Sequence, residues 1–203
     1  MFMKKGERTK QLIIEKASDI INTKGMAATS VEDVLEAAKI TRGCLLGHFP
    51  TKEDLNQACA DFMLTSFRDI RNNHMEKGQT ALEKIMGYFD FHKQPLRTPV
   101  EGGCPIMNLA VEADDTNPYV NRLVRKEIDH NITLFTNIFE EGKANGEFSG
   151  DLDSEEFATK MFAAIEGAYV FCRSKNSQKP MKIVIAGLKN ELATYATNKT
   201  KTN

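Results

Sequence analysis

Apolar residues recur along most of this chain at the three- and four-residue spacing that lines one face of a helix. The first such stripe comprises Leu12, Ile13, Ala17, Ile20 and Ile21. It predicts an amphipathic helix over residues 7–23, which ends at Gly25 because glycine tolerates left-handed backbone angles. A convincing period-two alternation, which would indicate strands, is missing. The pattern therefore predicts an all-α fold.

Two shorter apolar segments follow, and each is preceded by a residue suited to cap a helix. Ser30, with Asp33 three residues later, resembles a capping box and predicts a helix over residues 31–38. Residues 39–41 form a turn, Thr41 caps a third helix over residues 42–48, and Pro50 closes it. Two short helices joined by a tight turn form a helix-turn-helix, which we assign to residues 30–49.

Six further helices are predicted in the rest of the chain, which gives about nine in all. They are expected over residues 52–75, 80–93, 105–113, 118–145, 155–173 and 180–195, with a loop rich in proline and glycine at 95–103 and a polar tail from residue 197. We expect a three-helix N-terminal domain over residues 1–52 and a larger helical domain over residues 53–203.

Charge gives a local signal and no global one. The net charge of −1 at pH 7 offers no bulk attraction to nucleic acid, so any basic surface has to be local. The first ten residues carry Lys4, Lys5, Arg8 and Lys10 against one acid, Glu7. Between residues 39 and 52 there is no acid at all. Taken alone, such runs fit a solvated face as well as a binding surface.

Several kinds of site find no support in the pattern. The four cysteines form no CxxC pair and have no histidine at metal-ligand spacing, so we expect neither a structural metal nor a disulfide. No phosphate loop, dinucleotide fingerprint or catalytic triad points to an enzyme or to a cofactor. No apolar run approaches the roughly 18 residues of a membrane span, and none follows the basic N-terminus as in a signal peptide. We expect a cytoplasmic protein that is not an enzyme.

The third predicted helix has the shape that a recognition helix needs. The major groove is roughly 12 Å wide, so the exposed face of the helix has to be slim and polar or basic. That profile is provided by Arg42, Gly43, Cys44, Gly47 and His48. Leu45 and Phe49 are placed to anchor the helix inward. Any three-helix bundle with a short middle helix meets the same spacing, so spacing alone leaves both interpretations open.

A longer string of residues resembles the N-terminal domain of the tetracycline-repressor (TetR) family. The string is Ile13-x-x-x-Ala17, Gly25-x-x-x-Thr29-Ser30-Val31-x-x-Val34, Ala37-x-x-Ile40-Thr41-x-Gly43-x-Leu45 and His48-Phe49-Pro50-Thr51-Lys52-x-x-Leu55. The resemblance implies a dimeric DNA-binding regulator whose N-terminal domain binds an operator. It implies the DNA-contacting set Thr29, Thr41, Arg42, Gly43, Cys44, Leu46, Gly47, His48 and Lys52, in which helix caps and basic residues meet phosphates.

The chain departs from the family at the two positions before His48. The family commonly has aromatic residues there, usually with a tyrosine, whereas this chain has Leu46 and Gly47. Neither side chain can donate a hydrogen bond to phosphate. Leu46 is instead suited to touch a thymine methyl group. The departure also keeps open a small-molecule- or protein-binding member of the family with weakened DNA binding.

The C-terminal helices carry broad apolar faces, and in the family the last two helices pair with a second subunit. The faces comprise Phe157, Met161, Phe162, Ile165, Ala168, Tyr169 and Cys172 on one helix and Ile183, Ile185, Ala186, Leu188 and Leu192 on the other. Apolar faces of this size call for a partner, although a monomer can bury one of them in its own core. A dimer would place two recognition helices about 34 Å apart on a near-palindromic operator.

The resemblance also implies a pocket for a small-molecule inducer in the C-terminal domain. Our candidates are Phe89, His92, Cys104, Met107, Glu112, His130, Phe135, Phe162, Glu166 and Tyr169. Glu166 lies in an apolar run, where a buried acid needs a partner or a cationic ligand, so an acid paired across a dimer interface fits equally well. Histidines such as His92 and His130 more often pack in a core or lie on the surface than bind a ligand.

Residues Gly103-Cys104-Pro105-Ile106-Met107-Asn108-Leu109 resemble a Gly-Cys-x-x-x-Asn-Leu signature of one C-terminal branch of the family. Some members of that branch sense oxidants or electrophiles with this cysteine. A helix N-terminus lowers a thiol pKa, which makes Cys104 a candidate sensor, while a small packing residue is the simpler interpretation. The overall prediction is a repressor released by a small-molecule inducer, with a cysteine-based sensor as an alternative.

Overall fold

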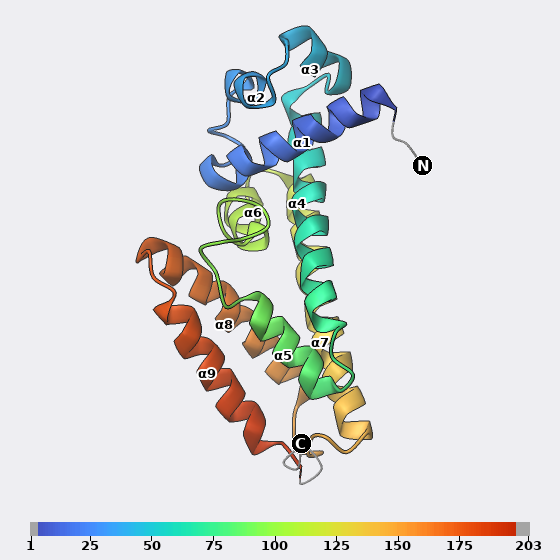
Figure 1. Ribbon diagram of the computed structural model, residues 1–203, viewed down its shortest axis with the longest axis vertical. Coiled ribbons are helices and arrows are strands. Elements are labelled where there is room, and N and C mark those ends of the chain that lie inside the picture. The colour runs from blue at the N-terminus through green and yellow to red at the C-terminus, as the bar shows by residue number, and fades with distance from the viewer. Residues whose placement is uncertain (1–3, 198–203) are drawn as a thin grey trace. The chain divides into compact units, whose positions relative to one another are not determined.

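The computed structural model describes residues 4–197, and its backbone in that range is built from nine helices (Figure 1). They are α1 (Lys5–Lys24), α2 (Val31–Ala38), α3 (Arg42–His48), α4 (Lys52–Met75), α5 (Ala81–Phe91), α6 (Pro105–Ala113), α7 (Pro118–Ala144), α8 (Ser154–Ser174) and α9 (Lys179–Thr194). Within the described range the extended pairing amounts to one isolated antiparallel bridge, between Phe148 and Ala196. The predicted all-α fold is confirmed. Residues 198–203 of the expected polar tail lie outside the described range.

The short N-terminal helices begin and end close to the residues that the capping pattern predicted. The Ser30 hydroxyl accepts a hydrogen bond from the Asp33 amide at 3.1 Å, and the Asp33 carboxylate accepts one from the Ser30 amide at 2.9 Å. This reciprocal pair satisfies amides that have no partner inside the helix. Gly25, at φ +91°, follows α1, and Lys39, at φ +53°, ends α2 in the left-handed conformation.

The chain folds into two compact units, and each unit draws on two stretches of sequence. The first unit comprises residues 1–67 and 98–125, and the second comprises residues 68–97 and 126–203. The long helices α4 and α7 each contribute to both units, and α6 belongs to the first. This division differs from the boundary after residue 52, which stays a prediction of where the functional domains divide.

The first unit packs α1, α2, α3 and the start of α4 around a small apolar core. Its centre includes Ile13, Ala17, Val34, Leu45 and Leu55, all of which are buried. The Cys59 thiol of α4 lies 3.7 Å from the Ile14 carbonyl oxygen of α1, so these two helices are in direct contact. This core fixes the angle between α2 and α3.

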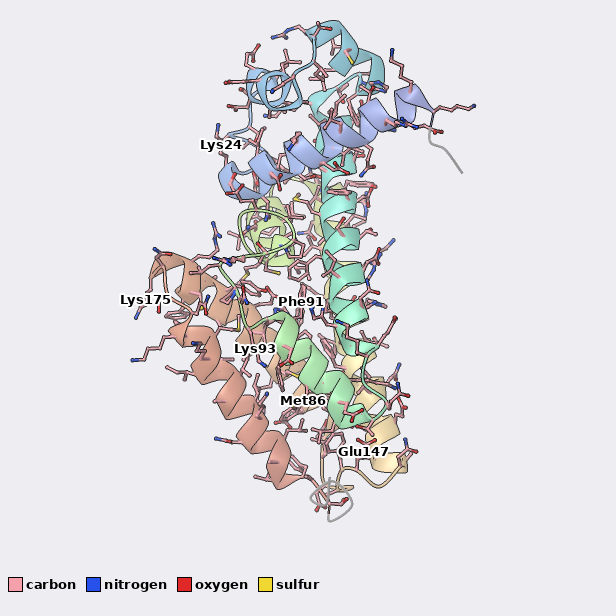
Figure 2. The ribbon with its side chains drawn as sticks, viewed as in Figure 1. Lys24, Met86, Phe91, Lys93, Glu147 and Lys175 are labelled. Carbon is pink, nitrogen blue, oxygen red and sulfur yellow. The ribbon has the colours of Figure 1, made fainter. Side chains whose placement is uncertain are left out.

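The second unit has an aromatic core between α5, α7 and α8. Tyr88 and Phe135 are buried with their ring centroids 4.5 Å apart. At Gly87 an added Cβ atom would lie 2.4 Å from the His74 carbonyl oxygen, so α5 approaches α4 too closely there for a side chain. Glu147, labelled in Figure 2, accepts hydrogen bonds from the first two amides of α5, those of Ala81 and Leu82, each at 3.0 Å. No helix in the described range is both long and apolar enough to span a membrane.

Candidate DNA interface and effector core

Helix α3 presents a narrow exposed face because its two large apolar anchors point inward. Leu45 and Phe49 are each only 3% exposed. On the opposite face Arg42, Gly43 and Leu46 are exposed, as is Gly47. A Cβ atom added at Gly43 or at Gly47 would meet nothing within 4 Å. The face is therefore slim and open, as entry into a groove requires.

The other predicted DNA-contacting residues are placed differently from one another. The exposed Thr41 caps α3 by accepting a hydrogen bond from the Cys44 amide at 3.3 Å. Cys44 and His48 are half-buried. The exposed Lys52 donates to the Ala27 carbonyl oxygen at 3.2 Å. Arg42 forms an exposed ion pair with Glu32 of α2, a partner that the sequence pattern did not indicate. All of these residues surround the exposed face of α3 or the ends of that helix.

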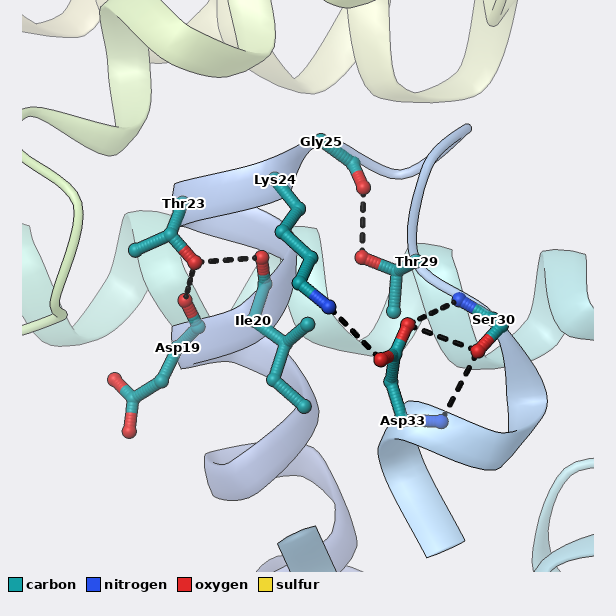
Figure 3. Close-up of polar contacts among 8 residues, drawn as sticks. All are labelled: Asp19, Ile20, Thr23, Lys24, Gly25, Thr29, Ser30 and Asp33. Atoms are coloured by element: carbon teal, nitrogen blue, oxygen red, sulfur yellow. Dashed lines mark hydrogen bonds and ion pairs between the residues drawn. The ribbon is translucent and has the colours of Figure 1, made fainter. Parts of the chain in front are cut away.

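Thr29 lies inside the unit instead of on its surface. It is 2% exposed, and its hydroxyl donates to the Gly25 carbonyl oxygen at 2.7 Å (Figure 3). This bond closes the turn between α1 and α2. The placement favours a role in positioning α2 over direct contact with phosphate.

The start of α2 is held by a small charged network, shown in Figure 3. Lys24 of α1 forms an ion pair with Asp33 of α2 at 2.8 Å, beside the capping bonds to Ser30. The hydrogen bond from Lys24, followed by those from Ser30, holds the pKa of Asp33 well below its usual range. The carboxylate therefore stays ionised and keeps α2 tied to α1.

The basic beginning of α1 lies beside the end of α3. The Lys10 ammonium is 5.5 Å from the centroid of the Phe49 ring, a cation–π contact. A Cβ atom added at Gly6 would be 4.0 Å from the His48 ring. Lys4, the N-cap residue of α1, and Lys5, its first residue, are exposed. The sequence revealed this local positive charge but not its position next to α3, which depends on contacts between distant residues.

Helix α6 and the loop before it are bonded to the far end of α1. The Glu112 carboxylate accepts hydrogen bonds from the amides of Met26 and Ala27, both at 2.8 Å. The Asn108 amide donates to the Asn22 backbone and side-chain oxygens, both at 3.0 Å. Glu112 was predicted to bind a ligand, but here it serves the turn between α1 and α2. Asn108 holds the same region, a role that sequence reasoning missed.

Cys104 and Met107 also belong to this first unit. Cys104 precedes α6 as its N-cap residue and is 1% exposed. Met107 is half-buried. A thiol that is this enclosed is poorly placed to meet a reagent from solvent, which favours the packing interpretation of Cys104.

The second unit brings together a different subset of the predicted ligand residues. Phe89, His92, Phe162, Glu166 and Tyr169 are all buried in it. His92 Nδ1 lies 2.8 Å from the Tyr169 hydroxyl. Burial, with a smaller effect of the Arg71 charge, lowers the pKa of His92 to about 3, so its ring is neutral at pH 7. His130 is exposed on α7, outside this cluster, and Phe135 is buried against Tyr88.

The second unit also contains a buried charged group that the sequence pattern did not predict. Arg71 of α4 is 1% exposed and donates a hydrogen bond to the Asn131 side chain of α7. Its guanidinium lies 3.7 Å from the Glu127 carboxylate, which also accepts a hydrogen bond from Arg68 at 2.8 Å. The four-residue spacing of Glu127 and Asn131 puts both on one face of α7. The sequence of α4 by itself does not indicate that Arg71 contacts Glu127 and Asn131.

The predicted apolar faces of α8 and α9 are mostly used inside the chain. Phe157, Met161, Ile165 and Cys172 are buried, as are Ile185, Leu188 and Leu192. Two large apolar side chains outside the predicted faces are exposed, Val170 at 47% and Phe171 at 59%. Within the predicted face of α9, Ile183 is 61% exposed and Ala186 is exposed as well, so the prediction of a single apolar face is only partly met there. Most residues of the two predicted faces are therefore buried in the chain's own core and not left for a partner. A narrower exposed strip remains, formed by Val170, Phe171 and Ile183.

In the described part of the chain all four cysteines are free, and no group of three or more His, Cys, Asp or Glu side chains is arranged to hold a metal ion.

Comparison with known proteins decides the family. Residues 13–59 match the family model "Bacterial regulatory proteins, tetR family", and residues 81–188 match "Tetracyclin repressor-like, C-terminal domain". The chain belongs to the tetracycline-repressor family. Between the two matched regions lie residues 60–80, which comprise the rest of α4 and the turn after it. In family terms, α2 and α3 are the helix-turn-helix.

Similar TetR proteins span nearly the whole chain. A TetR transcriptional regulator from Chloroflexus aurantiacus is 28% identical, with a TM-score of 0.91 and coverage of 96% of this chain and 98% of that one. The HTH-type transcriptional repressor DhaR of Mycobacterium sp. strain GP1 is 22% identical over 85% of this chain and 86% of its own length. The regulator QacR of Staphylococcus aureus is 24% identical over 86% and 92%. These relatives are transcriptional regulators and not enzymes.

The similar solved structures include a TetR regulator bound to DNA. A cysteine mutant of CifR, in complex with a 26-base-pair operator, shares the fold with a TM-score of 0.75 at 20% identity, over 88% of this chain and 95% of that one. At this identity the likeness concerns the fold alone.

Proposed function

We propose that this TetR protein is a repressor that binds a near-palindromic operator as a dimer and is released by a small-molecule inducer. The observation that carries the DNA-binding part is the exposed face of α3. Leu45 and Phe49 anchor the helix from behind, which leaves Arg42, Leu46 and the two glycines open to solvent. Basic residues at the start of α1 lie next to this face and supply charge for the phosphate backbone.

The exposed strip on α8 and α9 supports the dimer. A hollow of about 520 Å³ is lined there by Ala164, Gly167, Phe171, Ile183 and Val184, among others. Small residues beside exposed large ones allow a second copy of the same surface to pack closely against it, as a two-fold interface requires. Such a dimer would carry two copies of α3 about 34 Å apart, the length of one DNA turn.

For the inducer site we retain Phe89, His92, Phe162, Glu166 and Tyr169, because all five are buried in the second unit and His92 contacts the Tyr169 hydroxyl there. Cys104, Met107 and Glu112 are left out because they serve the first unit, and His130 because it is exposed. Repression is relieved only if the inducer binds the conformation that releases DNA more tightly than the conformation that holds it. Membership of the Gly-Cys-x-x-x-Asn-Leu branch is part of the same proposal.

Binding of the purified full-length protein to the DNA upstream of its own gene tests the main proposal. We expect specific binding whose affinity falls steeply as salt rises, because bound cations are released from the phosphates. Arg42→Ala should weaken binding, and Lys93→Ala is its matched control. Lys93, labelled in Figure 2, is likewise exposed and ion-paired, with Asp90, but lies in the second unit. Absence of binding at low salt, to this DNA and to a genomic library alike, would overturn the proposal.

The inducer part is tested separately. Compounds that raise the melting temperature of the protein are added to the preformed complex with DNA. We expect at least one of them to release the operator, and Phe162→Ala to reduce both effects. Compounds that bind in the second unit and leave operator affinity unchanged at saturation would contradict ligand control while leaving DNA binding intact.

A further inference from the structure

We propose that Leu46 is a specificity-determining residue that reads thymine through its C5-methyl group. The inference rests on the DNA-binding function proposed above and specifies its chemistry. It predicts that operator recognition depends on a methyl group in the major groove of each half-site.

The first observation is the position of Leu46 on α3. Its side chain is 52% exposed, while Leu45 beside it is 3% exposed. Gly43 and Gly47 lie three residues before it and one residue after it on the same exposed face, and both have open space where a side chain would stand. Leu46 therefore projects from a bare stretch of helix, and the backbone around it can come close to the floor of a groove.

The second observation is the scarcity of hydrogen-bonding groups around Leu46. Arg42, one turn earlier, has its guanidinium engaged with the Glu32 carboxylate of α2. Cys44 and His48 are half-buried. The middle of the face thus offers an apolar contact and little else. Among the base edges in the major groove, the thymine methyl is the group that such a contact distinguishes.

Leu46 also has an internal contact that the experiment has to separate from DNA reading. It helps to line a hollow of about 30 Å³ between α2, α3 and the start of α4, together with Val34, Leu45 and Leu55. If Leu46 serves only to pack α3, shortening it changes stability and weakens all DNA sequences alike. If it reads a methyl group, shortening it abolishes one particular discrimination.

The experiment first selects the operator from random duplexes with the wild-type dimer and then replaces each thymine by deoxyuridine, one symmetric pair at a time. Deoxyuridine keeps every hydrogen-bonding group of thymine and lacks only the methyl. At one symmetric pair we expect uracil to weaken wild-type binding about fourfold per half-site, the effect of one buried methyl group. At that pair, 5-methylcytosine paired with guanine should bind more tightly than cytosine paired with guanine.

The decisive variant is Leu46→Ala. Its affinity for the thymine duplex divided by its affinity for the deoxyuridine duplex, the thymine-to-uracil ratio at that pair, should fall to about one. Leu46→Met, which keeps an apolar side chain, should retain part of the ratio. Leu12→Ala is the matched control, since Leu12 is another exposed leucine of the first unit, at 40%, and should leave the ratio unchanged. Circular dichroism melts establish that each variant is folded.

The outcomes separate the two proposals. If the wild type binds the operator equally well whichever thymine is replaced by deoxyuridine, the inference is overturned and the repressor proposal stands. The same holds if Leu46→Ala binds with an unchanged thymine-to-uracil ratio. Failure to select any DNA would overturn the repressor proposal, and the inference with it.

Discussion

The exposed face of α3 and the polar core of the second unit use charged side chains in opposite ways. Arg42 pairs with Glu32 at the surface, where both side chains are more than half exposed. Arg71 pairs with Glu127 and Asn131 where almost no solvent reaches it. Water screens the first pair, so changing it should cost little stability. The second pair cannot be broken without leaving a buried charge. The exposed face of α3 therefore tolerates change, and the core does not.

The largest predicted effect comes from breaking the buried pair. Glu127→Gln removes the carboxylate that faces Arg71 and accepts a hydrogen bond from Arg68. We expect the free energy of unfolding to fall by about 3–5 kcal/mol, because the Arg71 charge stays buried without its counter-charge. Urea denaturation followed by circular dichroism measures the change.

Glu141→Gln is the control for that prediction. Glu141 lies on the same helix and pairs with Lys84 at 2.9 Å, but its side chain is 47% exposed. Removing it should lower the free energy of unfolding by less than about 1 kcal/mol. Equal losses for the two variants would contradict the contrast between surface and core.

The second prediction concerns pH and the buried His92. Its pKa is about 3 in the folded chain and near 6.5 when unfolded, so the unfolded chain binds the extra proton between these values. This contribution to stability is complete above pH 6.5 and is lost as the pH falls toward 3. We expect a loss approaching 1.4 kcal/mol for each pH unit below 6, measured by urea denaturation at several pH values.

Two histidine variants isolate that contribution. His92→Gln removes the titrating ring and should flatten the slope, whatever it does to stability at pH 7. His130→Gln removes an exposed ring and should leave the slope as it is. If both variants keep the wild-type slope, His92 is not the group that makes the fold sensitive to acid.

A third, smaller effect is expected at the cap of α2. Ser30→Ala removes the hydroxyl that accepts from the Asp33 amide, which should lower the free energy of unfolding by about 1 kcal/mol. Ser30→Gly should lower it by only a few tenths of a kcal/mol, since glycine is tolerated at an N-cap. Thermal melts that rank glycine below alanine would argue against this capping role.

The smallest predicted effect is a gain in stability at α3. Gly47→Ala adds a methyl group into open space and should stabilise the helix by about 0.5–1 kcal/mol. Gly87→Ala tests the same change in the second unit, where the new methyl would meet the His74 carbonyl oxygen, so it should destabilise the fold. Changes of the same sign in both variants, measured by chemical denaturation, would refute the view that the exposed face of α3 is open and the core is filled.

The sequence predicted what depends on neighbouring residues and missed what depends on distant ones. The cap at Ser30, the stop at Gly25 and the order of the helices follow from local rules, and the structure confirms them. The bonds from Glu112 to the turn after α1 join residues 85 and 86 positions apart, and Arg71 meets Asn131 across 60 positions. No spacing rule indicates such pairs. For the same reason, the buried part of the predicted α9 face could not be told apart from its exposed part, Ile183 and Ala186.

The two bare glycines of α3 have a consequence for how this regulator can change over evolutionary time. Gly43 and Gly47 have no left-handed backbone angle that would require glycine, and a side chain at either position would extend into open space. Each position can therefore accept an asparagine, glutamine or arginine, the residues that pair with adenine or guanine, without any change in the fold beneath. If α3 reads the operator as proposed, new operators lie one substitution away from the present one. The exposed face of α3 has room for two further side chains on a fold that is already complete.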